Sequence, residues 1–261
     1  SVTKPLTTKL IDDFNYSGAT TAAELKGDEI VRAIKKGIIA MDRPEFREAW
    51  MLYKEWTTTW ADGWNTQDLS QLWRDGKVAI REGGMWELQS ELSDTERTFK
   101  WGVFPVPVAG TDSSEYAVDF PRVKGFEANQ GPTFVMSVVK PSVEKNNTTE
   151  AAVLFLQYLT SPQVNEYLVN EIPMGRPSVK STATLPLFDA LKEAEYVKFP
   201  EITVPMPAWL SSEVYDTVNR NAALWFNNGI KDEPFFAEVQ KALMNGADEA
   251  IKSQKLDQSN W

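Results

Sequence analysis

Apolar residues between positions 44 and 60 recur every three or four residues, the spacing of one face of an α-helix. Pro44 and Glu45 are typical of a first helical turn, so the pattern predicts a helix that begins at Pro44. Because its tryptophans fall on the apolar face, we expect them to pack in a core. That face comprises Phe46, Ala49, Trp50, Tyr53, Trp56 and Trp60.

Similar periodicity and capping residues predict further helices along the chain. Ser161 precedes a proline suited to a first helical position, and Gly37 and Gly76 are typical of helix ends. Trp73 and Trp225 also fall on apolar helical faces and are expected in a core. The predicted helices lie near residues 28–36, 66–75, 149–159, 161–168, 186–194, 212–227 and 234–247.

Three short apolar runs predict β-strands between these helices. They lie at residues 77–80, 101–107 and 134–139, the last rich in β-branched and apolar residues. Prolines in the second run restrict it to the edge of a sheet. A few short strands among many helices favour an α/β fold with open sheets.

Composition narrows the chemistry of this chain of 261 residues. It has no cysteine and no histidine, which excludes thiolate nucleophiles, Ser-His-Asp triads and most transition-metal sites. A formal net charge of −10 disfavours binding to nucleic acids and to anionic lipid surfaces. The longest apolar runs are far shorter than the roughly 20 residues that span a bilayer. We therefore expect no metal and no cofactor, and any catalytic residue would have to be a carboxylate, a lysine, a tyrosine or part of a Ser–Lys pair.

Four segments carry a further signal in a fixed order. Residues 75–88 read G-K-x-A and then G-x-W, and residues 101–107 read G-V-x-P-x-P. Residues 134–163 combine an apolar strand with E-A-A-x-x-F-L-x-Y-L-x-S, and residues 175–177 form a glycine–proline turn. Together they resemble family 1 extracellular solute-binding proteins, the maltose-binding-protein-like sugar receptors of ABC importers. The resemblance spans about residues 42–253 and matches the C-terminal portion of this longer family.

This resemblance implies a periplasmic-binding-protein-like (type II) α/β fold that closes by a hinge around its ligand. Residues 1–130 and 186–261 would form the C-terminal lobe. Residues 131–185 would be a returning segment of the N-terminal lobe, the rest of which is missing from this chain. The strand expected at residues 134–139 would then lack its natural sheet partners.

Five residues are candidates for ligand contact. Trp86 follows the Gly83–Gly84 pair at a predicted strand end, where open α/β sheets place ligands, and it matches the stacking tryptophan of the family. Gly84 and Glu87 flank it, and a carboxylate there could accept a sugar hydroxyl. Trp209 precedes a helix among prolines, and Tyr215 lies one turn into that helix. Aromatic faces suit the apolar faces of sugar rings.

These residues favour a carbohydrate receptor that delivers a sugar or oligosaccharide to the permease subunits of an ABC importer, without catalysis. The resemblance implies an extracytoplasmic location, in the periplasm or on the outer face of the cell membrane. It also implies a lipoprotein, tethered by an anchor outside this chain, and a monomer when complete.

Two other classes of function remain open. Glu82 and Glu87 flank the glycine pair and could act as the carboxylate pair of a glycoside hydrolase. Alternatively, the chain could be a cell-surface binding or adhesion module whose aromatic patches bind a protein or a wall polymer.

Overall fold

A computed structural model describes most of the chain. The described residues are 3–18, 26–84, 87–104, 109–118, 137–172, 179, 182–183, 185–188, 210–259 and 261. Contacts between Cα atoms divide the chain into two compact units. Unit 1 comprises Ser1–Thr66, Val106–Gln130 and Tyr196–Trp261, and unit 2 comprises Gln67–Pro105 and Gly131–Glu195. The lobe boundaries expected from the resemblance remain a prediction.

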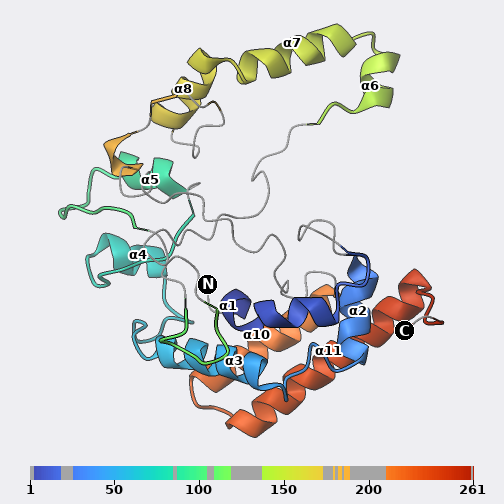
Figure 1. Cartoon of the computed structure of the whole chain (residues 1–261). Coiled ribbons are helices and arrows are strands. Elements are labelled where there is room, and N and C mark those ends of the chain that lie inside the picture. The colour runs from blue at the N-terminus through green and yellow to red at the C-terminus, as the bar shows by residue number, and fades with distance from the viewer. Residues whose placement is uncertain are drawn as a thin grey trace. The chain divides into compact units, whose positions relative to one another are not determined.

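Unit 1 is built from helices at both ends of the sequence (Figure 1). Its longest helix, α11, packs against α10 and α2, while the short helix α1 packs against α3. The helices are α1 (Thr3–Thr7), the 3-10 helix η1 (Thr8–Asp13), α2 (Gly27–Lys35), α3 (Pro44–Thr57), α10 (Ser212–Phe226) and α11 (Asp232–Gln254).

The core of unit 1 forms where α2, α10 and α11 bury their apolar faces. Gly246 of α11 allows the closest approach, because a Cβ atom there would lie 2.5 Å from Val214 Cγ2 of α10. The core includes Leu10, Phe14, Ile30, Ile34, Val214, Val218, Trp225, Phe235, Val239, Leu243 and Ala247. Apolar residues three and four apart on each helix therefore meet in one core, as their periodicity predicted.

Aromatic side chains cover one end of this core. Trp225 is fully buried and stacks on Phe235, with ring centroids 4.2 Å apart. Trp50 packs against the same core, in agreement with the sequence. Trp56 and Trp60, which were also expected in a core, are half-buried. Trp56 contacts Tyr53 in a tilted arrangement and Trp60 edge to face.

Unit 2 contains shorter helices joined in sequence. Helix α7 packs against both α6 and α8. The helices are α4 (Leu69–Arg74), α5 (Leu88–Ser93), α6 (Lys140–Lys145), α7 (Thr149–Leu159), α8 (Pro162–Asn170) and the 3-10 helix η4 (Pro186–Phe188). Of the helix predicted at residues 186–194, η4 is the part that falls among the described residues.

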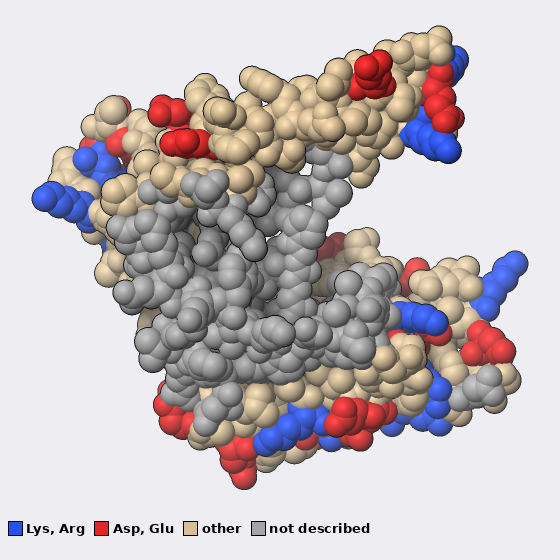
Figure 2. All heavy atoms as spheres, turned by 45° about the horizontal axis from the view of Figure 1, so that its top comes forward, with Lys and Arg blue, Asp and Glu red and all other residues tan. Residues whose placement is uncertain are grey.

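Helix α7 has no buried side chain. Figure 2 shows its surface with few charged residues, since Glu150 is the one charged side chain on this helix. Four of its large apolar residues are 44–62% exposed, namely Val153, Leu154, Phe155 and Tyr158, whereas Leu156 and Leu159 are half-buried. An apolar helix exposed to this extent is unusual in a soluble domain.

Helix positions agree with the sequence, whereas some capping residues differ. Ser161 precedes Pro162 at the start of α8 as predicted, and Gly37 and Gly76 adopt positive φ angles of 71° and 67° just after α2 and α4. Asp68 rather than Thr66 caps α4, because its Oδ1 accepts the backbone N–H groups of Ser70 and Gln71 at 2.9 and 3.1 Å. Helices α1, α5 and α6 were not predicted.

The predicted α/β, periplasmic-binding-protein-like fold class is wrong for the part of the chain that the structure describes, which contains helices and no β-strand. Among the residues that the structure places, 77–80 and 101–104 find no strand partner to satisfy their backbone groups, although a strand requires one. Ile80 is 69% exposed and Phe104 57%, so these apolar runs do not enter a sheet core. Residues 105–107 and 134–136 lie outside the described residues.

Among the residues placed by the structure, no helix combines the length and apolar character needed to cross a membrane.

Candidate functional site

The predicted ligand segment leads from a glycine pair into α5. Gly84 and Glu87 are both described and half-buried, and the Glu87 N–H donates to the Gly84 carbonyl at 3.0 Å. The structure thus brings two of the five predicted residues together. Trp86 and Trp209 lie outside the described residues.

Arg81 connects Glu87 to a second carboxylate. Its Nη2 donates to Glu87 Oε2 and its Nη1 donates to Glu91 Oε1, both at 2.6 Å. The Arg81 side chain is 21% exposed, Glu87 32% and Glu91 15%. Short hydrogen bonds between charged side chains that are largely shielded from solvent hold both carboxylates in a defined geometry.

Glu91 is the centre of this network. Its Oε2 accepts from Trp73 Nε1 at 2.9 Å and from Arg97 Nη2 at 2.5 Å. Burial opposes ionisation of Glu91, but the hydrogen bonds from Trp73 and Arg97 and the charges of Arg97 and Arg81 outweigh it and lower the pKa of this carboxyl. Glu91 is therefore an anion that accepts from three donors.

Arg97 anchors the network in an aromatic setting. Its side chain is 4% exposed and also contacts Asp94 Oδ2 at 3.1 Å. The guanidinium lies 5.4–5.6 Å from the ring centroids of Trp73, Phe99 and Trp101, within the range of cation–π attraction. This packing fixes Arg97 and, through it, the Glu91 carboxylate.

Gly83 leaves the space that the Glu87 carboxylate occupies. A Cβ atom at position 83 would lie 2.7 Å from Glu87 Oε2, closer than a real Cβ contact. The glycine pair, first noted as a strand end, thus has a second role in the structure. It lets a carboxylate approach the backbone closely.

Tyr215, the remaining predicted residue with a described position, belongs to unit 1. It lies in the first turns of α10, between the buried residues Val214 and Val218, and is half-buried. Burial raises the pKa of its hydroxyl, so it is a neutral donor and acceptor at pH 7. A half-buried aromatic ring with a neutral hydroxyl suits contact with a sugar.

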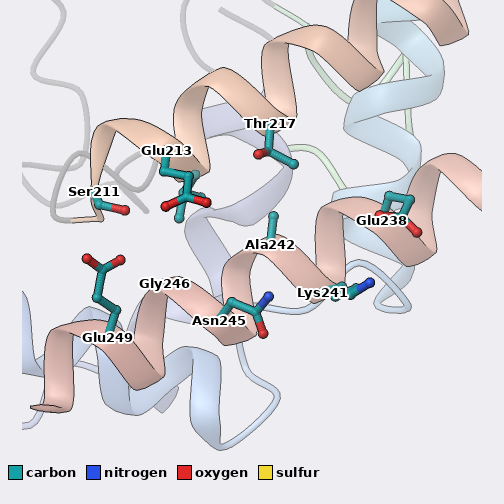
Figure 3. A pocket seen from close by; sticks show the side chains of 10 residues that line it. Ser211, Glu213, Thr217, Glu238, Lys241, Ala242, Asn245, Gly246 and Glu249 are labelled. Atoms are coloured by element: carbon teal, nitrogen blue, oxygen red, sulfur yellow. The ribbon is translucent and has the colours of Figure 1, made fainter.

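A groove between α10 and α11 was not anticipated from the sequence. Figure 3 shows Glu213 of α10 and Glu249 of α11 pointing toward the space between the helices. The groove has a volume of about 250 Å³, and three glutamates against one lysine make it acidic. Besides Val214, its lining is Ser211, Glu213, Thr217, Glu238, Lys241, Ala242, Asn245, Gly246 and Glu249.

A second unanticipated groove lies at the junction of α7 and α8. It has a volume of about 570 Å³ and is lined by Tyr158, Ser161, Gln163, Val164 and Tyr167. Tyr158 is 62% exposed and Tyr167 55%. The tyrosines were visible in the sequence, but their common groove depends on the angle between two helices.

Comparison with known families identifies the family of this chain. A family model described as "Bacterial extracellular solute-binding protein" matches residues 10–196, more than half of the chain. The chain belongs to this family. This match confirms the family resemblance found in the sequence. It does not specify a sugar as the ligand. No curated protein and no solved structure matches the chain.

Family membership settles the general role of this solute-binding protein. It is an extracytoplasmic, ligand-binding receptor for transport, which confirms the predicted location. Solute-binding proteins of this kind are generally non-catalytic and bind small molecules for ABC transporters. Within the described residues, no group of three or more acidic side chains could hold a metal ion.

The network around Glu87 contains residues that sequence reasoning missed. Arg81 binds both the predicted Glu87 and Glu91, and Arg97 binds Glu91, yet their separations of six and ten residues do not place them on one face of a helix. The mixture of charges and tryptophans between residues 73 and 101 was the available signal. Charge alternation of that kind is common on solvated surfaces and does not by itself indicate a network.

Proposed function

We propose that this solute-binding protein is a receptor for a sugar or oligosaccharide. The observation that carries the proposal is the Glu87 carboxylate, held by Arg81 beside the Gly83–Gly84 pair and one residue after Trp86 in sequence. An oriented carboxylate can accept a sugar hydroxyl, and an adjacent tryptophan can stack on the apolar face of a sugar ring. Family membership supplies the ligand-binding role.

The five predicted residues are proposed as the ligand contacts, with Trp86 as the main stacking surface. Gly84 and Glu87 would contribute from the segment before α5, and Trp209 and Tyr215 from the segment that leads into α10. The protein would close around the sugar by a hinge. It would then deliver the sugar to the permease subunits of an ABC importer. Contacts to both sides of the ligand would favour the closed state.

The proposal is tested by calorimetric titration of the purified protein with a panel of mono- and oligosaccharides, and with amino acids as a second panel. We expect saturable binding of at least one carbohydrate. Trp86→Ala should weaken it by about 100-fold, because an aromatic anchor contributes on the order of 2–4 kcal/mol. Phe104→Ala is the matched control, since it removes an exposed aromatic ring of the same unit that no contact here assigns to the ligand.

Three results would contradict the proposal. Binding of an amino acid but of no carbohydrate would reassign the ligand class. An unchanged affinity in Trp86→Ala would remove the stacking role. Turnover of a chromogenic glycoside, lost in Glu87→Gln, would favour the glycoside hydrolase alternative instead.

A further inference from the structure

Arg81 donates hydrogen bonds to two different carboxylates. One guanidinium nitrogen reaches Glu87 Oε2 and the other reaches Glu91 Oε1, each at 2.6 Å. Because guanidinium is planar and its donors have fixed directions, two such bonds restrict the orientation of both carboxylates. Arg81 therefore couples the position of Glu87 to that of Glu91.

Glu91 is the fixed end of this pair. Trp73 Nε1 and Arg97 Nη2 hold its Oε2, and the Arg97 side chain is 4% exposed against three aromatic rings. Glu87 has more solvent around it, at 32% exposure, and lies at the ligand end. The network thus runs from a packed anchor to a carboxylate that a ligand can reach.

Gly83 acts on the same carboxylate from the other side. Its lack of a side chain admits Glu87 Oε2, which would lie 2.7 Å from a Cβ atom. The Glu87 N–H also donates to the Gly84 carbonyl at 3.0 Å. Glu87 is therefore held by Arg81 and by the Gly84 carbonyl, and its carboxylate lies close to Gly83.

We propose that Arg81 is a positioning residue for the solute site. By bridging Glu91 and Glu87 it sets the Glu87 carboxylate to accept a hydroxyl of the bound carbohydrate. The identity of that ligand rests on the proposed function. A contact held in place before the ligand arrives strengthens binding because less conformational freedom is lost on association.

The first test measures affinity for the carbohydrate found by titration. Arg81→Met should weaken binding on the order of tenfold, as for outer contacts that orient metal-ligating side chains. Arg81→Lys should restore part of this loss at most, because an ammonium does not reproduce the two-pronged geometry. Lys77→Met is the control: it removes a nearby surface ion pair with Asp75 and should leave the affinity unchanged.

A double-mutant cycle separates positioning from a general structural role. If Arg81 acts through Glu87, then Arg81→Met should cost little further affinity once Glu87→Gln is present. Strictly additive losses would overturn the proposal. Gly83→Ala should weaken binding as well, because its Cβ displaces the Glu87 carboxylate.

The second test needs no ligand. In protein labelled with 5-fluorotryptophan, the ¹⁹F resonances of Trp86 and Trp73 are assigned by their loss in Trp86→Phe and Trp73→Phe. Arg81→Met should shift or broaden the Trp86 resonance and leave that of Trp73, whose bond to Glu91 remains. Lys77→Met should move neither resonance.

The outcomes of the two tests distinguish the positioning role of Arg81 from the proposed binding of a carbohydrate. A Trp86 resonance that moves in a protein binding no carbohydrate supports positioning by Arg81 and contradicts the proposed function. Carbohydrate binding that is unchanged in Arg81→Met, with the Trp86 resonance unmoved, overturns the positioning role alone. Loss of both the Trp86 and the Trp73 resonances would also overturn it, since Arg81 would then support the whole cluster.

Discussion

Glu91 shows how one carboxylate can accept hydrogen bonds from side chains of three separate segments between residues 73 and 97. It accepts hydrogen bonds from Trp73, Arg81 and Arg97, and it is 15% exposed. Removing it would leave several donors with reduced solvation and without their acceptor. Such groups are costly because a partly buried donor is not fully compensated by water.

The lowered pKa of Glu91 predicts a specific dependence of stability on pH. Its folded pKa lies below the ordinary value of 4.5, so its contribution to stability is present above pH 4.5 and is lost as the pH falls through the folded pKa. Glu91→Gln should therefore be less stable than the parent protein at pH 7. The difference should shrink as the pH falls below 4.5.

Urea unfolding of both proteins between pH 3 and pH 7 measures this difference. A gap in free energy of unfolding that stays constant over the range would show that ionised Glu91 contributes nothing specific. A gap that widens on acidification would reverse the assigned direction of the shift.

Single residues were predictable from the sequence where burial follows from the apolar face of their own helix. The burial of Trp225 followed from its helical face, and its indole N–H finds Asp232 at 2.8 Å, only seven residues away. Arg97 had no comparable signal. Its partners depend on how α4, α5 and the segment after α5 fold back on one another, and composition cannot provide that.

At the scale of elements, Gly246 controls how closely α10 and α11 approach. A methyl group there would lie 2.5 Å from Val214 Cγ2, so Gly246→Ala forces the helices apart despite the higher helix propensity of alanine. We expect a loss of about 1–3 kcal/mol in the free energy of unfolding, the usual cost of overpacking.

Chemical denaturation of Gly246→Ala and Gly102→Ala tests this expectation. Gly102 is the matched control, since a Cβ atom there meets nothing within 4 Å. Equal stability of the two variants would mean that α10 and α11 can separate without cost. A gain in stability for Gly246→Ala would mean that helix propensity outweighs the contact.

The exposed apolar side chains of α7 predict that the purified protein binds hydrophobic dyes and tends to self-associate. Its exposed leucine, phenylalanine and tyrosine side chains form an apolar surface that water solvates poorly. Leu154→Lys should lower the fluorescence of the hydrophobic dye ANS and the light scattering at high protein concentration. Gln157→Lys on the same helix adds the same charge to an exposed polar position and should change both signals less.

If both variants lower the two signals equally, added charge rather than the apolar surface explains the effect. If neither does, the α7 surface is covered in solution.

Helices were easier to predict than strands for a physical reason. A helix satisfies its backbone hydrogen bonds within one segment, so the apolar period and terminal residues of α3, α8 and α10 were sufficient. A strand needs a partner elsewhere in the chain. The run at residues 77–80 has strand-like composition but has no such partner in the described part of the chain, and Ile80 is exposed.

At the scale of the whole molecule, the family could be recognised while the ligand class remains a proposal. Motif order along the chain carries family membership, and the match over residues 10–196 agrees with it. Ligand choice depends instead on where a few side chains converge. Of the five residues chosen from the sequence, Gly84 and Glu87 meet in the structure, and the network that orients Glu87 became visible only from distances.

The core of unit 1 joins the two ends of the chain. Lys35, at the end of α2, pairs with Asp248 of α11 at 2.7 Å across a separation of 213 residues. The Met41 N–H donates to Gln240 across 199 residues. At about 5–20 residues per second, a ribosome would complete α11 roughly 10–40 s after α2. Until then the apolar face of α2 lacks its contacts with α11, so the core of unit 1 cannot be completed before α11 emerges.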